Sequence, residues 1–349
     1  MKWYLETGPE GDAVVSTRVR LARNISYMPF PCKMSMEQAK KTEDLTRDAL
    51  FSADAAVTSD YDYIDMANLS GAKAASYAEK HLISPQFAEN RQGRALLLKK
   101  DESISIMINE EDHIRIQSLF AGLRLHDAME RANRIDDLLD GRLHYAFDEN
   151  LGYLTECPTN LGTGLRASVM VHLPALTRAG SLPSLTQAMA KIGFTIRGLY
   201  GEGSKGMGSF YQISNQVTLG LSEEEILRSL SGVIGQIISQ ERNMRNEFKN
   251  MGPVFEDGIF RSFGILSNAR MLTSNEFMAL ISDVRFGITM GIIKAVPLEV
   301  INTLLCEVQP ATLQTKENHP MNEQERDVLR AQIVREALTN ANVGESRNA

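Results

Sequence analysis

Two short apolar segments, RALLLKK and SISIMINEED, follow one another in the sequence and are separated only by the charged pair Asp101-Glu102. In the second segment Ile104, Ile106 and Ile108 alternate with other residues, which is the period-two pattern of a half-buried strand. The segments are therefore predicted to be strands joined by a charged turn. Neighbouring strands that pair in this way form hairpins, which constrains the fold more than any other feature of the sequence.

Four further segments are predicted strands. They are AVVSTRVRLARN (13–24), ASVMVHLP, FTIRGLYGEG and SFYQISNQVTLG, and the last two flank a glycine-rich loop. Because the strands follow one another in hairpins rather than in strict βαβ alternation, the sequence predicts an α+β fold with an antiparallel β-sheet flanked by helices.

Helices are predicted between these strands and almost throughout the chain after them, because apolar residues recur there with helical spacing. A capping box of Ser222 and Glu225 marks the start of a long helix. A connecting loop is expected at 309–320. The predicted helices lie from about residue 113, over 127–140, over 181–193, from 222 to about 248, from about 255 onward and over 323–341.

The composition argues against several kinds of protein. A net charge of −7 disfavours general nucleic-acid binding, which needs a cationic face. The N-terminus has no signal-peptide core, and no apolar run approaches the roughly 20 residues that span a bilayer. The histidines form no HExxH pair, so no protein-held metal is expected. Three widely spaced cysteines, Cys32, Cys157 and Cys306, indicate a reducing cytoplasm rather than a disulfide framework.

The first candidate site is the acidic stretch NEEDHIR (109–115), in which Glu110, Glu111 and Asp112 end a predicted strand. Alternation along that strand places Glu110 on the Ile108 face and Glu111 on the opposite face. By itself the stretch favours a solvated acidic turn or a helix N-terminus. The alternative is a carboxylate that is aimed at a cationic substrate or serves as a base.

The second candidate site is the glycine-rich stretch RGLYGEGSKGMGS (197–209), which contains a G-x-G-x-x-G pattern. Dinucleotide-binding use of this pattern requires a helix to begin at the glycines, and here a strand is expected to follow. The stretch is therefore predicted to be a loop that presents Glu202, with a plain flexible hairpin as the alternative.

A third set consists of arginines at predicted strand ends or beside glycine turns. Each alone is more often a surface ion pair than a ligand. Together they would suit a polyphosphate, because one guanidinium group binds two phosphate oxygens at once. The chain has no G-x-x-x-x-G-K-[ST] motif, so a P-loop is excluded as the phosphate-binding device. The arginines are Arg18, Arg20, Arg115, Arg166 and Arg197.

The stretch ECPTNLGTGLRAS (156–168) joins a cysteine, a glycine turn and Arg166 within a few residues. Three interpretations are open from the residues alone. Cys157 is a nucleophilic thiol, or the turn binds phosphate, or the segment is a buried turn in which the cysteine is a small apolar side chain.

STRVRLARN, NEEDHIR, CPTNLGTGLRASV and RGLYGEG…YQISN occur in the order and at about the spacings of the phosphagen (guanidino) kinase family, which the chain resembles over about residues 10–250. The resemblance implies transfer of the ATP γ-phosphoryl group to a guanidino nitrogen. The chain looks most similar to the bacterial protein-arginine kinase branch. Only 15 residues precede STRVR, where phosphagen kinases carry a small helical domain, and RDVLRA (326–331) resembles the phosphoarginine-reading motif of that branch.

The resemblance implies a phosphagen kinase/glutamine synthetase-like catalytic domain at 1–250 and a helical domain with a phosphoarginine-binding motif at 251–349. It also implies ATP and Mg²⁺ as cofactors, arginine side chains of proteins as substrates, and a homodimer in the cytoplasm. A stress-response role is implied as well: marking proteins for a Clp-type protease and relieving a repressor, with a zinc-containing activator protein as partner. Two alternatives stay open, a kinase for free arginine or another small guanidino compound, and an inactive adaptor that binds phosphoarginine.

Residue roles follow from the same resemblance. Glu111 and Glu202 are expected to grip the substrate guanidinium, with Glu111 as the base. Cys157 is expected to lie against the guanidinium, where nearby cations favour the thiolate, without becoming a covalent nucleophile. His81 matches a nucleotide-contacting position, with an ordinary surface histidine as the alternative. The other expected ATP-binding residues are Ser16, Thr17, Arg18, Val19, Arg20, Arg115, Arg166, Ala167, Ser168, Val169, Met170, Arg197, Gly198, Leu199, Tyr200 and Gly201.

The C-terminal motif has two interpretations. By periodicity alone, Arg326 and Arg330 are four residues apart on one face of an amphipathic helix. The resemblance instead implies a second anion site formed by Arg326, Asp327, Arg330 and Ala331.

Overall fold

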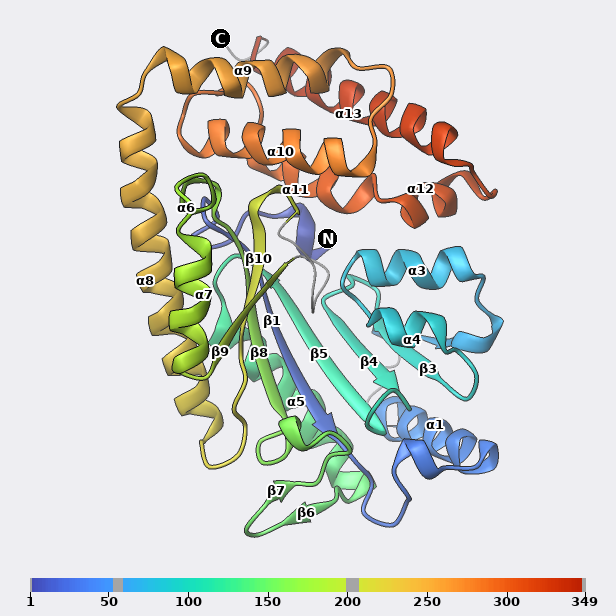
Figure 1. Cartoon of the computed structure of the whole chain (residues 1–349). Helices are drawn as coiled ribbons and strands as arrows, with labels where there is room; N and C mark the ends of the chain where they lie inside the picture. Colours follow the sequence, from blue (N-terminus) through green and yellow to red (C-terminus); the bar gives the residue numbers. More distant parts are fainter. Residues whose placement is uncertain (1, 53–58, 199–206, 347–349) are drawn as a thin grey trace.

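The computed structural model describes residues 2–52, 59–198 and 207–346. Its centre is an eight-stranded sheet in which every neighbouring pair of strands runs antiparallel (Figure 1). The predicted α+β fold is thereby confirmed. The order across the sheet is β2 (Tyr61–Asp65), β3 (Ala95–Lys99), β4 (Ile104–Ile108), β5 (Ile114–Ala121), β1 (Val14–Arg23), β8 (Leu165–His172), β10 (Phe210–Asn215) and β9 (Phe194–Gly198).

Helices cover one face of this sheet. Val19 and Leu21 of β1 and Ile116 of β5 belong to a large apolar cluster on that face, and the residues between them point the other way because side chains alternate along a strand. A small separate hairpin of β6 (Phe147–Asp148) and β7 (Gly152–Tyr153) follows one of these helices. The helices that contribute to the cluster are α1 (Met36–Phe51), α5 (Leu125–Leu143), α7 (Leu182–Lys191) and α8 (Glu223–Lys249).

The opposite face is covered only in part. Over β3, β4 and β5 it packs against α3 (Gly71–Glu79), α4 (Pro85–Glu89) and the 3-10 turn η1 (Trp3–Leu5) through a separate apolar cluster. The strand β4 is therefore buried on both faces, and its prediction as half-buried is wrong. Ser105 is enclosed there and donates to the Leu82 carbonyl at 2.6 Å. Over β1, β8 and β10 the same face carries polar side chains instead.

Two predicted elements differ in the structure. The helix expected from residue 113 is wrong, because 114–121 form β5, which begins with Ile114 and Ile116 alternating with Arg115 and Gln117. The loop expected at 309–320 contains α12 (Pro310–Glu317). The Glu79 carboxylate accepts from the first free amides of α12 and so stabilises the start of this short helix.

Beyond α8 the chain is helical and builds its own apolar cluster, which lies past one end of the sheet (Figure 1). The predicted capping box of Ser222 and Glu225 is confirmed at the start of α8. Thr273 caps α10 by accepting from the Glu276 amide at 3.2 Å. The helices are α9 (Pro253–Asn268), α10 (Ser274–Thr289), α11 (Leu298–Glu307), α12 and α13 (Glu323–Ser346).

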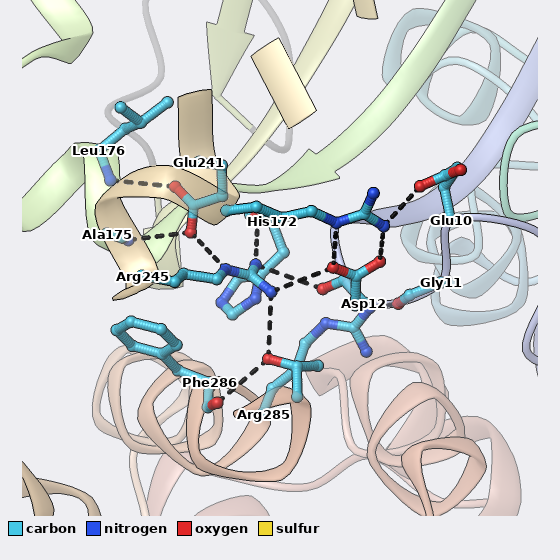
Figure 2. Close-up of polar contacts among 12 residues, drawn as sticks. Glu10, Gly11, Asp12, His172, Ala175, Leu176, Glu241, Arg245, Arg285 and Phe286 are labelled. Atoms are coloured by element: carbon cyan, nitrogen blue, oxygen red, sulfur yellow. Dashed lines mark hydrogen bonds and ion pairs between the residues drawn. The ribbon is translucent and has the colours of Figure 1, made fainter. Parts of the chain in front are cut away.

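A buried carboxylate on α8 holds the start of a neighbouring helix (Figure 2). Glu241 is fully buried and accepts from the amides of Ala175 and Leu176 at 3.1 and 3.0 Å, in the first turn of α6 (Pro174–Arg178). It also accepts from Arg245 Nε at 2.8 Å. These three bonds satisfy a charge that would otherwise be costly to bury.

Arg245 connects this carboxylate to three other segments of the chain (Figure 2). Its guanidinium donates to the carbonyls of His172 and Asp12, at 3.2 and 3.3 Å, and to the Thr289 hydroxyl at 3.3 Å. Thr289 ends α10, whereas His172 ends β8, so this one side chain joins the C-terminal helices to the sheet.

Replacing Glu241 with Ala is expected to lower the free energy of unfolding by about 3–5 kcal/mol. It removes the nearer of the two carboxylates that pair with Arg245, leaving Asp12 at 3.5 Å, and it deprives the amides of Ala175 and Leu176 of their acceptor. Denaturant or thermal unfolding measures the loss. Glu247→Ala removes an exposed carboxylate from the same helix and should change stability by less than about 0.5 kcal/mol. Equal stabilities for the two variants would show that the network contributes nothing.

Candidate active site

Strand pairing gathers predicted arginines on the polar face of the sheet. Arg20 on β1 lies opposite Arg166 on β8 and Gln117 on β5, and directly paired residues point to the same side of a sheet. Arg18 lies opposite Ser168 in the same way. Although 150 residues separate Arg18 from Ser168, the motifs STRVR and GLRAS thus become neighbours.

A cavity of about 610 Å³ opens over this face. Its size is typical of ligand pockets, which span about 300–1,000 Å³. Gln212 of β10 fixes one of the arginines in it by accepting from Arg18 at 2.7 Å. The predicted site residues that line the cavity are Arg18, Arg20, His81, Glu111, Arg115, Cys157, Arg166 and Arg197.

The other predicted nucleotide-binding residues lie on both faces of their strands, some toward the cavity and some away from it. Ser16, Ser168 and Met170 line a small hollow that adjoins the cavity at Arg18 and His81. Side chains that point away from the cavity are those of Thr17, Val19, Ala167 and Val169.

The glycine-rich stretch is described only in part. Gly198 ends β9 and is paired with Tyr211 of β10. The remaining predicted residues of this stretch lie outside the described residues, and they are Leu199, Tyr200, Gly201 and Glu202.

The guanidinium groups in the cavity repel one another. Burial, followed by Arg166 and Arg115, lowers the pKa of Arg18 to about 10. The pKa of Arg20 is lowered well below its ordinary value, again first by burial and then by neighbouring arginines. The Nε of Arg20 has no hydrogen-bond partner among the described residues. An anion with several oxygens would neutralise this excess of half-buried positive charge and accept a hydrogen bond from Arg20 Nε.

His81 adds no charge to this cluster. Burial and the nearby Arg18 lower the pKa of His81 to about 4, so the imidazole is neutral at pH 7. Its backbone has a left-handed φ of 59°, and its carbonyl accepts from Gln117 at 2.7 Å. The ring therefore lines the cavity as a neutral group held in a fixed backbone conformation.

Two carboxylates line the cavity beside Arg115. Glu110 and Glu111 both form ion pairs with it, Glu111 at 2.8 Å. The prediction that these acids point to opposite faces is wrong, because Asn109 has a left-handed φ of 61° and ends the strand alternation before them. Glu110 is 7% exposed and accepts from the Ser84 hydroxyl, whereas Glu111 is 39% exposed. Of the two, Glu111 is the carboxylate that a molecule in the cavity can reach.

A buried set of polar side chains behind these acids was not predicted. Asp112 Oδ1 accepts from Asn24 Nδ2 at 2.7 Å and from the Glu156 amide at 2.8 Å. Asn24 Oδ1 in turn accepts from the His113 amide at 2.9 Å. These bonds tie the acidic turn to the residue before Cys157. The only sign of this role in the sequence is that Asn24 and Asp112 lie inside two of the motifs.

Cys157 reaches the cavity from the loop that these bonds hold. Its sulfur lies 3.0 Å from the Thr159 hydroxyl. The glycines that follow allow close packing, since a Cβ on Gly164, whose φ is 62°, would lie 2.6 Å from the Ala22 carbonyl oxygen. The turn therefore brings Arg166 directly against β1.

The RDVLRA motif lies on α13. Arg330 is 1% exposed and donates to the carbonyls of Val308 and Leu272 at 3.0 and 2.6 Å. It also donates to the Asp327 carboxylate at 2.6 Å. The side chain of Arg330 is thus part of the packing of the C-terminal helices. The four predicted residues are the half-buried Arg326 and Asp327 and the buried Arg330 and Ala331.

In the part of the chain that the structure describes, no three His, Cys, Asp or Glu side chains lie together in a metal-binding arrangement. None of the helices within 2–52, 59–198 and 207–346 combines the length and the apolar character of a membrane span.

Solved structures with this architecture are kinases. Lombricine kinase superposes with a TM-score of 0.61 at 25% identity, covering 69% of each chain. The duplicated taurocyamine kinase of Schistosoma mansoni gives a TM-score of 0.61 at 27% identity, covering 72% of this chain and 37% of that one. The fold and the cavity therefore define an enzyme of the phosphagen kinase class.

Sequence comparison gives the family. The profile of the ATP:guanido phosphotransferase C-terminal catalytic domain matches residues 41–244, and that of the protein-arginine kinase McsB C-terminal domain matches residues 253–349. The chain belongs to the ATP:guanido phosphotransferase family, within its protein-arginine kinase group. It is 47% identical over 324 residues to the protein-arginine kinase of Caldanaerobacter subterraneus (93% of this chain, 96% of that protein). It is also 47% identical over 337 residues to that of Geobacillus stearothermophilus (96% and 93%).

Proposed function

We propose that this protein transfers the γ-phosphoryl group of ATP to arginine side chains of proteins. The observation that carries the proposal is the content of one cavity, in which half-buried, mutually repelling arginines lie beside Glu111 and Cys157. The arginines suit a triphosphate, and a carboxylate with a thiol suits a guanidinium. The protein-arginine kinase relatives support a protein as the acceptor.

The reaction needs a base, because a guanidinium stays protonated at neutral pH and its nitrogens are then poor nucleophiles. Glu111 takes a proton from the attacking nitrogen as the bond between nitrogen and the γ-phosphorus forms. The bond from that phosphorus to its bridging oxygen breaks, and ADP leaves with the electron pair. Glu202 is proposed as the second carboxylate, which orients the guanidinium for this attack.

The arginines are proposed to hold the triphosphate and to neutralise the charge on the transferring group. His81 and the hollow lined by Ser16, Ser168 and Met170 would hold the rest of the nucleotide. Thr17, Val19, Ala167, Val169 and Gly198 are proposed to contact the nucleotide through their backbone groups. Leu199, Tyr200 and Gly201, which follow Gly198 in the sequence, are proposed to contact it as well. Mg²⁺ would be held mainly by the nucleotide and water, and would offset the negative charge of the phosphates.

Replacing Cys157 with Ser is expected to lower kcat by about tenfold, which is roughly 1.4 kcal/mol. A hydroxyl keeps the contact with Thr159, but it does not ionise beside a cation as a thiol can. The comparison is with Glu111→Gln under the same conditions, measured as phosphoarginine formed per enzyme. A loss as large as that of the glutamate variant would make the thiolate essential.

The RDVLRA motif is proposed to bind phosphoarginine and to activate the enzyme. Replacing both Arg326 and Arg330 with Ala should then abolish activation by phosphoarginine. Arg330→Ala also leaves buried carbonyl groups without a donor, which costs about 1–3 kcal/mol for each unsatisfied group, so the double variant confounds binding with stability. Arg326→Ala is therefore the cleaner change and should keep basal kcat within about twofold.

Isothermal titration with free phosphoarginine checks this second site. Val328→Ala, at an exposed position of the same helix, serves as the control and should bind and respond as the wild type does. Unchanged phosphoarginine binding to the Arg326 variant would contradict the proposed site.

The cellular role is proposed from family membership, with the match of residues 253–349 to the protein-arginine kinase C-terminal domain in support. In this proposal residues 1–250 are the catalytic domain, and 251–349 are the helical domain with the phosphoarginine motif. The protein would work in the cytoplasm as a homodimer with a zinc-containing activator protein. Phosphorylated proteins would pass to a Clp-type protease, and a stress repressor would be released.

Incubation with Mg-ATP and a denatured arginine-rich protein, followed by mass spectrometry under conditions that preserve acid-labile phosphate, tests the proposed function. The expected product is phosphoarginine in the protein. Phosphorylation of free arginine but not of the protein would instead favour a small guanidino substrate. Binding of phosphoarginine without any transfer would favour an adaptor.

A further inference from the structure

A second hollow, of about 310 Å³, continues from the cavity. The two hollows share Arg94 and Glu110 in their linings and so adjoin at these residues. Arg94 is held in place by the carbonyls of Gln86 and Asn90, which accept from it at 3.0 and 2.8 Å. The hollow is thus a groove that begins beside the carboxylates, whereas the hollow lined by Ser16 adjoins the cavity at Arg18.

This arrangement gives the cavity two distinct exits. The exit at Arg18 and His81 suits the nucleotide, whose phosphates lie on the arginines. The exit at Glu110 is bordered by Glu156, the residue before Cys157, whose carboxylate accepts from the Cys32 amide at 3.2 Å. Whatever is attached to the guanidinium would leave through this second exit, because Glu111, which is proposed to hold the guanidinium, lines the cavity beside Glu110.

An unused hydrogen-bond acceptor lines the groove. Both amide hydrogens of Asn109 are engaged, by the carbonyls of Ala39 and Gly93 at 3.0 and 2.9 Å, which fixes the orientation of the amide. Its Oδ1 has no partner among the described residues, although Asn109 is only 5% exposed. Buried acceptors of this kind are nearly always paired. A main-chain N–H lying in the groove would complete this one.

Two methionines add an adaptable apolar part to a groove whose lining is otherwise mainly polar. Met34 and Met36 line it, and Met36 is 61% exposed at the start of α1. A Cβ atom on Gly93, whose φ is 65°, would lie 3.1 Å from Met36 Cε and 3.3 Å from Ala39 Cβ. A side chain at this position would therefore crowd the lining of the groove. Methionine side chains adjust to differently shaped partners and are common on surfaces that bind many sequences.

We propose that this groove binds the extended main chain of a protein substrate next to the arginine that is phosphorylated. The proposal rests on the proposed function and adds the place where the acceptor protein lies. A main-chain N–H of the substrate donates to Asn109 Oδ1, and a neighbouring side chain packs on Met34 and Met36. Such a groove would recognise the main chain and the size of the neighbouring side chain, and not one particular amino-acid sequence.

Met36→Lys tests the groove, because it places a cation where arginine-bearing, basic segments must pass. The exposed position suggests that the fold tolerates the change. Ile192→Lys is the matched control, since Ile192 is 56% exposed at the end of α7 and does not line the groove. Two acceptors are compared, a denatured arginine-rich protein and Nα-acetyl-arginine methylamide, together with binding of a fluorescent peptide that has one central arginine.

For Met36→Lys we expect kcat/KM for the protein and peptide affinity to fall about tenfold. The KM for ATP, and turnover of the small compound where the wild type shows any, should stay within about twofold. The groove proposal would be overturned if kcat/KM for the protein and the peptide affinity equalled the wild-type values. A loss of nucleotide binding as large as these losses would overturn it too. A wild type that phosphorylates no protein would contradict the proposed function instead, and the peptide measurement would still decide about the groove.

Discussion

Glu111→Gln abolishes phosphoryl transfer, by at least about a thousandfold, in an enzyme that still folds and still binds ATP. This is the result expected if Glu111 is the base, because an amide of nearly the same shape cannot take up the proton that the attacking nitrogen must lose. Single-turnover phosphorylation of a denatured arginine-rich protein measures the loss. A nucleotide titration confirms that the ATP site is intact.

Glu110→Gln is the control for this experiment. Glu110 and Glu111 are both ion-paired with Arg115, so any effect that comes only from releasing Arg115 should appear in both variants. Glu110 also lines the cavity, but only 7% of its side chain is exposed, against 39% for Glu111, so it offers a guanidinium much less contact. We expect its replacement to cost about tenfold or less. Equal losses would remove Glu111 from the role of base and make Arg115 the sensitive group.

The arginine side of the site could be predicted because strands keep a strict alternation. Arg18 and Arg20 are two residues apart, and so are Arg166 and Ser168, so each pair must share one face once its strand is known. The antiparallel fold was predictable for a related reason, namely that short connections favour hairpins. The pairing of β1 with β8 is long-range and was not predicted; the resemblance only assigned residues of both strands to one ATP site.

The parts that could not be predicted depend on tertiary packing. The alternation in β4 predicts one buried face. The other face is buried as well, because α3 and α4, which precede β3 in the sequence, pack against it. Asn109 ends the alternation by a left-handed φ, and nothing in NEEDHIR alone indicates that conformation. The start of α12 is stabilised by Glu79, more than two hundred residues earlier, as the sequence separation of 232 shows. Contacts of this kind leave no local pattern.

Replacing Arg20 with Met is expected to raise the melting temperature of the ligand-free protein and to lower phosphoryl transfer at least about a hundredfold. The pKa of Arg20 is lowered by burial and neighbouring arginines, whereas in the unfolded chain the guanidinium keeps its ordinary pKa. At neutral pH the charged form therefore opposes folding. An apolar side chain of similar length removes that cost, and we expect a gain of about 0.5–2 kcal/mol.

Arg23→Met, on the same strand, is the matched control and is expected to change stability in the opposite direction. Arg23 is 1% exposed, and its guanidinium binds the Asp136 carboxylate at 2.7 Å, so its loss should lower stability by about 3–5 kcal/mol. Thermal unfolding with and without excess ATP completes the comparison, because at a given concentration a ligand that binds more tightly stabilises the fold more. The wild type should gain more from ATP than Arg20→Met does. A less stable Arg20 variant that still gains fully from ATP would mean that this arginine supports the fold and not the nucleotide.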